Sequence, residues 1–296
     1  MILKLLIFSL LASLVSCGSF KTLSRKKTKE YLAQEGGLKT VVDYFGNANL
    51  VNNKVVGMVI AVIRPQGVEY FAYGYRDKEK KIAMTTDTIF QIGSITKVFT
   101  ASLMSVLEDE KYLDSTLPIT AYMKPGFKPR TDWVRHITLE DLASHTSGLP
   151  AEYQNAKMLK SAVRFLYTGD NIWKDLYEKE LWTFVENYNF GYQERRHFRY
   201  SNVAYVLLGG VLGKVVPGKN FDTLIKEEIT DPLNLTDTKF VLNKEQSVRL
   251  ATGYSGSSPP FMRRGIPMPA WEFHEGLKAA GGLYSTAKDL VGFLKA

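Results

Sequence analysis

Apolar positions in the first third of the chain form two short runs that predict a β-hairpin. Residues 55–63 are apolar and rich in β-branched side chains, as in a buried strand. Residues 64–67 (Arg-Pro-Gln-Gly) carry turn residues, and residues 68–74 form a second apolar and aromatic run. The pattern predicts two strands joined by a tight turn.

Beyond the hairpin the apolar spacing becomes helical. From Ile95 to Asp109 the apolar side chains recur every three or four positions, which predicts an amphipathic helix. Residues 118–231 contain further helix-like segments and many aromatics, and 204–215 is apolar over a helical length, which favours a core helix. Residues 255–269 are rich in Pro and Gly and predict a loop, and residues 286–294 start another helix.

The N-terminus predicts export and lipid attachment. Residues 1–16 hold one early lysine and an apolar run too short to span a bilayer, and Cys17, the only cysteine, follows directly. The segment resembles a bacterial lipoprotein signal peptide, with Cys17 as the lipidated residue; an ordinary signal peptide with an incidental cysteine is the alternative. Residues 17–36 are expected to be a basic tether, either resting on anionic lipid or simply solvated. The expected location is the bacterial cell envelope, on a membrane and facing the periplasm or exterior.

Composition excludes several other classes of protein. The chain has 296 residues, 45% hydrophobic and 23% charged, with a net charge of +8 spread along it. These values are typical of a globular protein, and the lack of an arginine-rich run argues against nucleic-acid binding. The four histidines show no paired metal-ligand spacing, and no phosphate-cradling Gly-rich loop is evident. No metal or other cofactor is therefore predicted.

The first candidate for chemistry is the tetrad Ser94-Ile95-Thr96-Lys97 at the start of the predicted helix. Positions i and i+3 share a helix face, so the Ser94 hydroxyl and the Lys97 amine can approach each other. A serine becomes a good nucleophile only when a base takes its proton, and a lysine with a lowered pKa can do so. A lone tetrad of this kind is more often a helix cap beside an exposed lysine.

A second candidate, Tyr200-Ser201-Asn202, precedes the apolar run at 204–215. Tyr200 can serve as general base or proton relay with Lys97, and Asn202 can donate to an amide carbonyl of the substrate. In isolation the triplet equally fits a helix-start turn with a packed tyrosine.

Four blocks together resemble the serine β-lactamase and penicillin-binding superfamily, and most of all its class C branch, which includes D-alanyl-D-alanine carboxypeptidases, endopeptidases and esterases. The blocks stand in the family's order: residues 88–101 (TIFQIGSITKVFTA), 137–150 (ITLEDLASHTSGLP), 198–209 (FRYSNVAYVLLG) and 279–290 (AAGGLYSTAKDL). The resemblance implies Ser94 as the acylated nucleophile, Lys97 as base or relay, Tyr200 as second proton-transfer group and Asn202 as substrate contact. It also implies an α/β fold of the α+β type, with an antiparallel sheet flanked by helices and a mainly helical lobe at about 115–235.

The chain departs from the family pattern near its C-terminus. The family's third motif, Lys-Thr-Gly or His-x-Gly on a strand lining the cleft, is not found after the 279–290 block. His274-Glu275-Gly276 has the form but precedes that block and lacks a strand-like setting. We therefore expect residues 37–296 to be a hydrolase domain lacking its C-terminal strands. The hairpin would then be the only visible part of the sheet, and an isolated hairpin is marginal in water.

Two further features have structural interpretations. His145 stands beside Ser147, but the proton-transfer roles are already filled by Lys97 and Tyr200, so we expect a structural loop there. Gly281-Gly282 predicts a close backbone approach near the cleft.

Two hypotheses on function remain. One is an acyl-transfer hydrolase acting on peptidoglycan peptides, β-lactams or acyl esters through Ser94. The other is a non-catalytic or degenerate envelope lipoprotein that keeps a hydrolase-like scaffold.

Overall fold

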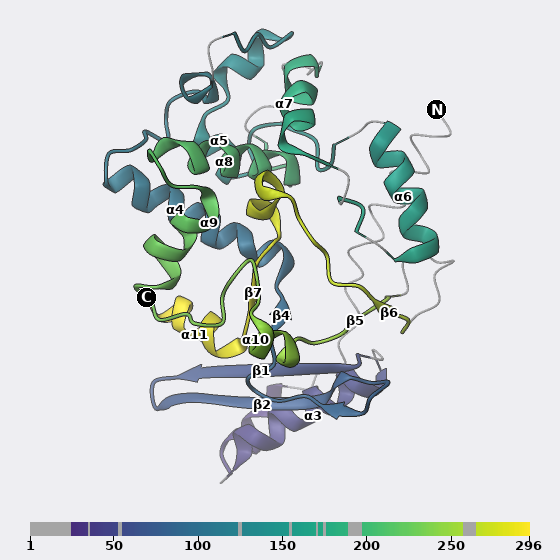
Figure 1. Ribbon diagram of the computed structural model, residues 1–296. Helices are drawn as coiled ribbons and strands as arrows, with labels where there is room; N and C mark the ends of the chain where they lie inside the picture. The colour runs from purple at the N-terminus through teal and green to yellow at the C-terminus, as the bar shows by residue number, and fades with distance from the viewer. Residues whose placement is uncertain are drawn as a thin grey trace. The chain divides into compact units, whose positions relative to one another are not determined.

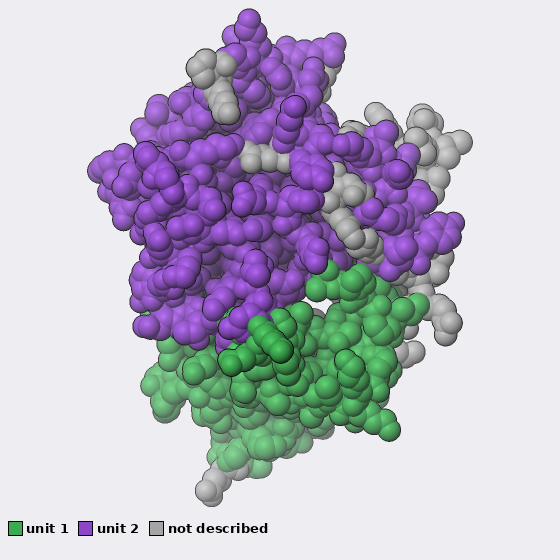
Figure 2. All heavy atoms as spheres, in the orientation of Figure 1, with its two compact units in different colours: residues 1–90, 244–270, 286–295 green, residues 91–243, 271–285, 296 purple. Residues whose placement is uncertain are grey.

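The computed structural model describes residues 25–34, 36–52, 55–123, 126–153, 156–169, 171–173, 176–188, 197–256 and 265–296 (Figure 1). The predicted leader and Cys17 lie outside these residues. The chain divides into two compact units, coloured separately in Figure 2. Unit 1 comprises residues 1–90, 244–270 and 286–295, and unit 2 comprises residues 91–243, 271–285 and 296.

Unit 1 contains the predicted hairpin. Strands β1 (Gly57–Arg64) and β2 (Gly67–Asp77) pair antiparallel from Gly57 opposite Gly74 to Arg64 opposite Gly67. A short strand β3 (Ile82–Ala83) adds to β2 and gives a three-stranded sheet in the order β1-β2-β3. The apolar, β-branched runs and the turn residues between them therefore predicted both strands and the turn correctly.

The expectation of an isolated hairpin is wrong. Helix α3 (Gly37–Asn52) packs against β1 and β2, and α11 (Ala287–Lys295) packs against β1, as Figure 1 also shows for α3. The Tyr73 hydroxyl on β2 donates to an Asp43 carboxylate oxygen on α3 over 2.7 Å. Buried Val41 and Val42 lie on α3. Helices far apart in the sequence thus cover the apolar side chains of the strands.

Two segments of unit 1 expected to lack regular structure have some. Residues 25–32 of the expected tether form helix α2 (Arg25–Leu32), which packs against α3. Within the expected loop at 255–269, strand β6 (Pro267–Met268) pairs with β5 (Gly253–Tyr254). Helix α10 (Lys244–Arg249) precedes β5.

Unit 2 is mainly helical, as expected for the middle of the chain. Its α-helices are α4 (Thr96–Asp109), α5 (Leu139–Ala143), α6 (Ala156–Thr168), α7 (Glu178–Asn187), α8 (Asn202–Val215) and α9 (Phe221–Leu224). Unit 2 also contains the 3₁₀-helices η1 (Gly93–Ile95), η2 (Ile119–Tyr122), η3 (Asp132–His136) and η6 (Glu275–Ala280), and the π-helix η5 (Ile225–Thr230). Strand β4 (Phe90–Gln91) pairs with β7 (Tyr284–Ser285).

Helix α8 forms the centre of unit 2, as its unbroken apolar run predicts. Every residue from Val203 to Leu212 is buried, and α8 packs against α4, α5, α7, α9 and η6. Gly209 permits the close approach of η6, because a Cβ at this position would lie 2.2 Å from the Ala279 Cβ. The core therefore holds α4, the start of α8 and η6 together, and these three elements carry the candidate site.

Candidate active site

Ser94 lies in the turn η1, directly before α4. The preceding Gly93 has a φ of 51°, a left-handed conformation that glycine adopts without strain. The side chain of Ser94 is exposed. Its N–H belongs to the first helical turn, whose amide hydrogens have no partner within the helix and where the helix dipole is positive. The hydroxyl thus stands at the start of a helix, as predicted, although α4 proper begins two residues later.

Lys97 is buried beside Ser94 on the same helix face, as the i, i+3 spacing predicted. Its side chain is 5% exposed, and Nζ lies 3.1 Å from Ser94 Oγ and 2.5 Å from the carbonyl oxygen of Ala280. Nζ also lies 5.1 Å from the ring centre of Tyr200. Burial lowers the pKa of Lys97 to about 8, although the nearby Glu152 acts in the opposite direction. A substantial fraction of the amine is therefore neutral near neutral pH.

Tyr200 completes the contact with Ser94 from the start of α8. Its hydroxyl donates to Ser94 Oγ over 2.7 Å. Burial raises the pKa of Tyr200 above its ordinary value, and the hydrogen bond to Ser94 partly offsets this. Ser94 Oγ thus accepts from both Tyr200 and Lys97, and its own hydrogen remains available for transfer.

The triplet 200–202 is a helix-start turn that the 145–151 segment holds in place. Ser201 caps α8, because its Oγ accepts from the Ala204 N–H over 3.0 Å and donates to the Pro150 carbonyl over 2.8 Å. The Asn202 N–H donates to the Ala151 carbonyl over 2.9 Å. The triplet is therefore a helix-start turn capped by Ser201, and the same turn places the Tyr200 hydroxyl at Ser94.

His145 has the structural setting that we expected. Its Nδ1 accepts from the Ser201 N–H over 3.1 Å, its carbonyl accepts from the Arg199 N–H, and its ring lies 4.5 Å from the Tyr200 ring. Burial lowers the pKa of His145, and the charge of Lys97 adds to this. A neutral imidazole that accepts at Nδ1 supports the backbone and ring of the tyrosine segment.

Asn202, predicted to contact the substrate, has a protein partner in the structure. Its Nδ2 donates to Oε1 of Glu152 over 2.6 Å. Glu152 is 9% exposed, and burial raises its pKa to about 8. Nothing in the sequence pattern singled out Glu152 beyond an acidic residue that closely follows the 137–150 block.

The block at 279–283 borders the site through backbone groups. Thr100 Oγ1 donates to the Ala279 carbonyl over 2.8 Å, and Thr96 Oγ1 accepts from the Leu283 N–H over 3.1 Å. With the bond from Lys97 to Ala280, these contacts fasten η6 and the following residues to α4. The close approach predicted for the glycine pair occurs at Gly282, where a Cβ would lie 3.0 Å from the Lys278 Cα.

A cavity of about 160 Å³ opens beside Ser94. It is lined by Gln91, Gly93, Ser94, Trp173, Asn202, Val206, Trp271, Phe273, Leu277, Ala280 and Gly281. Most of these side chains are apolar or aromatic, and the polar ones are those of Gln91, Ser94 and Asn202. A small apolar pocket with a few convergent polar groups is the usual form of a ligand site.

His274, which begins the His-x-Gly sequence at residues 274–276, does not lie on a strand. It precedes the turn η6, and its ring stacks on the Tyr177 ring at 4.3 Å. Within the described ranges no cluster of His, Cys, Asp or Glu suits a metal ion, and no helix is both long and apolar enough to cross a bilayer.

The profile of the Beta-lactamase family matches residues 30–296. The chain belongs to this family. It is a member of the serine β-lactamase and penicillin-binding superfamily, in the class C-related branch, as the four sequence blocks indicated.

Several relatives and solved structures support this membership. The chain is 26% identical over 289 residues to the D-alanyl-D-alanine-carboxypeptidase/endopeptidase AmpH of Escherichia coli, covering 97% of this chain and 68% of that protein. It is 30% identical over 220 residues to the teichoic acid D-alanine hydrolase of Staphylococcus aureus, covering 74% of this chain and 48% of that protein.

The fold is similar to that of solved class C β-lactamases. One matches with a TM-score of 0.70 and 20% identity, covering 93% of this chain and 66% of that chain. The enzyme of Rhodobacter sphaeroides matches with a TM-score of 0.66 and 22% identity, covering 84% of this chain and 62% of that chain. The chain therefore spans slightly less than two thirds of these structures, and the α+β fold class predicted from the sequence is confirmed.

Proposed function

We propose that the chain forms an acyl-enzyme on Ser94, with Lys97 and Tyr200 as its proton-transfer groups. The observation that carries the proposal is the pair of hydrogen bonds to Ser94 Oγ, 3.1 Å from Lys97 Nζ and 2.7 Å from the Tyr200 hydroxyl. A nucleophile within hydrogen-bond reach of a base that is itself held in place is the arrangement that covalent catalysis requires.

In the proposed reaction, the neutral amine of Lys97 takes the proton of Ser94 as Oγ attacks the substrate carbonyl. The lowered pKa of Lys97 makes the neutral form accessible near neutral pH. The Ser94 N–H, in the first turn before α4, is placed to donate to the oxygen that becomes negative.

Collapse of the tetrahedral intermediate then requires a proton on the leaving group. Tyr200 donates its hydroxyl proton to that group and recovers one from Lys97, whose ammonium lies 5.1 Å from its ring centre. Water resolves the acyl-enzyme by the same transfers in reverse, which regenerates free Ser94.

For the substrate we propose a D-alanyl carbonyl group in a cell-envelope polymer, either a peptide or an ester. The proposal is supported by the names of two relatives, one a D-alanyl-D-alanine carboxypeptidase/endopeptidase and the other a teichoic acid D-alanine hydrolase. The small cavity beside Ser94 suits a short acyl group. β-Lactams and simple acyl esters are further acyl donors of the same chemical class.

The test is acylation of the full chain by a fluorescent penicillin, followed by mass spectrometry of the labelled peptide. We expect one label, on Ser94, and no label on Ser94→Ala. Ser105→Ala, on α4, is the matched control, because its Oγ bonds within the helix to the Ala101 carbonyl, and it should label like the wild type. An unlabelled wild type that also hydrolyses no D-alanyl or acyl ester would refute the proposal.

We further propose that Cys17 carries the lipid and that the protein lies in the bacterial cell envelope. The sequence of residues 1–17 supports this, since a short apolar leader ends at the single cysteine. Several acyl chains on one cysteine are enough for stable anchoring. Expression in a bacterial host with a radiolabelled fatty acid should label the wild type and leave Cys17→Ser unlabelled and outside the membrane fraction.

A further inference from the structure

A buried carboxyl group, that of Glu152, contacts the Asn202 side chain, which lines the Ser94 cavity, and only one of its two oxygens is hydrogen-bonded within the described part of the chain. Glu152 is 9% exposed, and its Oε1 accepts from Asn202. Its Oε2 is buried without a hydrogen-bond partner among the residues described. Such an atom costs free energy in the empty protein, and native proteins keep such groups where a function requires them.

Glu152 determines which end of the Asn202 amide faces the cavity. Asn202 lines the cavity, and its Nδ2 is turned toward Glu152. The amide nitrogen and oxygen point in different directions, so this bond leaves Oδ1 as the free acceptor of the side chain. The cavity therefore offers an acceptor to a substrate group that donates hydrogen bonds.

Three aromatic side chains, those of Trp173, Trp271 and Phe273, also line the cavity and are called the aromatic wall below. Gln91 holds Trp271 at both backbone groups, donating to its carbonyl over 2.5 Å and accepting from its N–H over 3.0 Å. Asn171 accepts from the Trp173 N–H over 2.9 Å. Aromatic faces held in this way attract cations through the ring quadrupole.

The charges around Glu152 also favour a cationic ligand. Lys97 is the cation that interacts with Glu152, and Tyr200 is a neighbouring titratable group, while His145 interacts with Lys97. When Lys97 acts as a neutral base, the carboxylate of Glu152 has no counter-charge from Lys97. Burial opposes its ionisation, and a second cation supplied by the substrate would stabilise the ionised form.

We infer that Glu152, Asn202 and the aromatic wall form an ammonium subsite that selects acyl donors with a free amino group. The preferred substrate class would be aminoacyl esters such as D-alanyl esters, rather than N-acylated D-alanyl peptides. The inference rests on the proposed function for its link to turnover. Its binding element rests on the contact between Glu152 and Asn202 and on the aromatic residues that line the cavity.

A binding experiment tests the subsite without catalysis. The tryptophan fluorescence of the Ser94→Ala chain is titrated with D-alaninamide, D-lactamide and N-acetyl-D-alaninamide, which differ at the group replacing the free amine. We expect D-alaninamide to bind about tenfold more tightly than the other two, as for a desolvated cation with aromatic and carboxylate partners. Equal affinity for all three overturns the inference, and this comparison requires no variant at Glu152.

A second arm assigns the preference to Glu152. In the Glu152→Gln variant, with Ser94→Ala as before, the preference for D-alaninamide should fall to less than about threefold while N-acetyl-D-alaninamide binds as before. Glu227→Gln, an exposed glutamate paired with Lys219, is the matched control and should retain the full preference. A preference that survives in Glu152→Gln would contradict the role of the carboxyl group.

A third arm separates this inference from the proposed function. The benzyl esters of D-alanine and N-acetyl-D-alanine are assayed with the wild-type chain and with Glu152→Gln. Hydrolysis of both esters at equal rates, dependent on Ser94, upholds the proposed function and overturns the subsite. Loss of both rates in equal proportion in Glu152→Gln would mean that Glu152 acts only through Lys97, which also overturns the subsite. Tight binding of D-alaninamide without any turnover would uphold the subsite and refute the hydrolase.

Discussion

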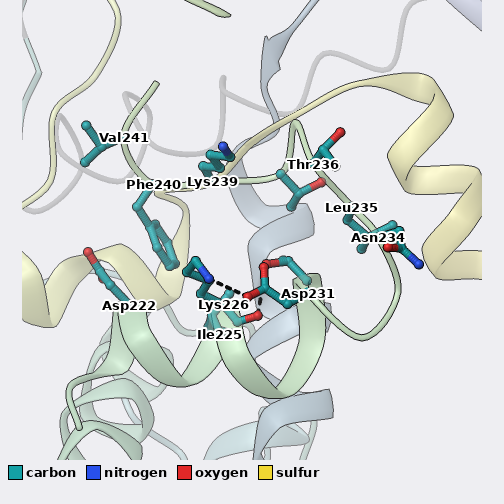
Figure 3. A pocket seen from close by; sticks show the side chains of 12 residues that line it. Asp222, Ile225, Lys226, Asp231, Asn234, Leu235, Thr236, Lys239, Phe240 and Val241 are labelled. Carbon is teal, nitrogen blue, oxygen red and sulfur yellow. Dashed lines mark hydrogen bonds and ion pairs between the residues drawn. The ribbon is translucent and has the colours of Figure 1, made fainter. Parts of the chain in front are cut away.

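Two cavities lined by described residues of unit 2 differ in size and in the state of their polar groups. The Ser94 cavity measures about 160 Å³, and a second cavity, lined by residues between Asp222 and Val241, measures about 520 Å³. Figure 3 shows the second cavity between the helical turn that carries Lys226 and Asp231 and the segment that carries Phe240. The larger cavity does not contain the candidate residues Ser94 and Asn202, which line the smaller one.

The polar groups of the second cavity already have partners or lie in solvent. Lys226 forms an ion pair with Asp231, and their side chains are 67% and 55% exposed. Asp231 raises the pKa of Lys226, which keeps the amine charged. Phe240 packs against Phe221 at a ring distance of 5.7 Å.

The pKa values of Lys97 and Lys226 show the difference between the two cavities. Burial lowers the pKa of Lys97 to about 8, whereas a carboxylate partner in solvent raises that of Lys226. A buried lysine that is partly neutral can act as a base, but its burial lowers the stability of the fold. A surface ion pair contributes little to catalysis or to stability. The candidate site is identified by buried groups with shifted pKa values and incomplete hydrogen bonding, and not by the volume of its cavity. The predictions below test this contrast between the two cavities.

The largest expected effect is at Lys97. Lys97→Met should lower kcat/KM for an acyl ester by roughly 10³-fold or more, because the base for Ser94 is lost. Lys226→Met, the matched control, should leave kcat/KM unchanged. Comparable losses in the two variants would remove the contrast between the cavities.

Lys97→Met should also be more stable than the wild type at pH 7, by about 1–2 kcal/mol in urea unfolding, because a buried charge is removed. The wild type should gain stability as the pH rises from about 8, the folded-state pKa of Lys97, to its ordinary value of 10.5, since the unfolded chain then binds more protons. Lys97→Met should lack that gain. A wild type with no such gain would contradict the lowered pKa of Lys97.

Next in size is Tyr200. Tyr200→Phe should lower kcat/KM by about 10²-fold, since the proton donor to the leaving group is removed while the ring remains. Tyr205→Phe is the control, because the Tyr205 hydroxyl donates to the Ala143 carbonyl and does not contact Ser94. Equal rates for Tyr200→Phe and Tyr205→Phe would exclude Tyr200 from proton transfer.

A smaller effect concerns the pH dependence of turnover. For the wild type, kcat/KM should rise with pH through an apparent pKa of about 8, because Lys97 must lose its proton to act as a base. In Glu152→Gln the rise should move to lower pH, because Glu152 raises the pKa of Lys97. A rise displaced to higher pH in the variant would contradict this coupling.

The smallest effect is expected at the second cavity. Asp231→Asn removes the charge that pairs with Lys226 and should leave the free energy of unfolding unchanged within the error of urea unfolding, because exposed ion pairs are weak. Ester hydrolysis and penicillin labelling should not change. A clear loss of either activity would show that the second cavity takes part in function after all.

Local patterns in the sequence determined much of this protein. The short apolar runs predicted β1 and β2, the helical spacing of apolar residues predicted α4, the long apolar run predicted α8, and the i, i+3 spacing placed Lys97 beside Ser94. These features depend on residues close together in the chain, where backbone geometry relates position to direction. The order of the four blocks along the chain was enough to identify the family.

Only the tertiary structure decided how the site is enclosed. Glu152 and Asn202 lie 50 positions apart, and Gln91 and Trp271 lie 180 apart. No local period relates such residues, so neither the half-satisfied carboxyl group nor the aromatic wall was predicted. The same holds for the cover that α3 and α11 give the hairpin. Short-range geometry thus determined which residues could react, and long-range packing decided what surrounds them.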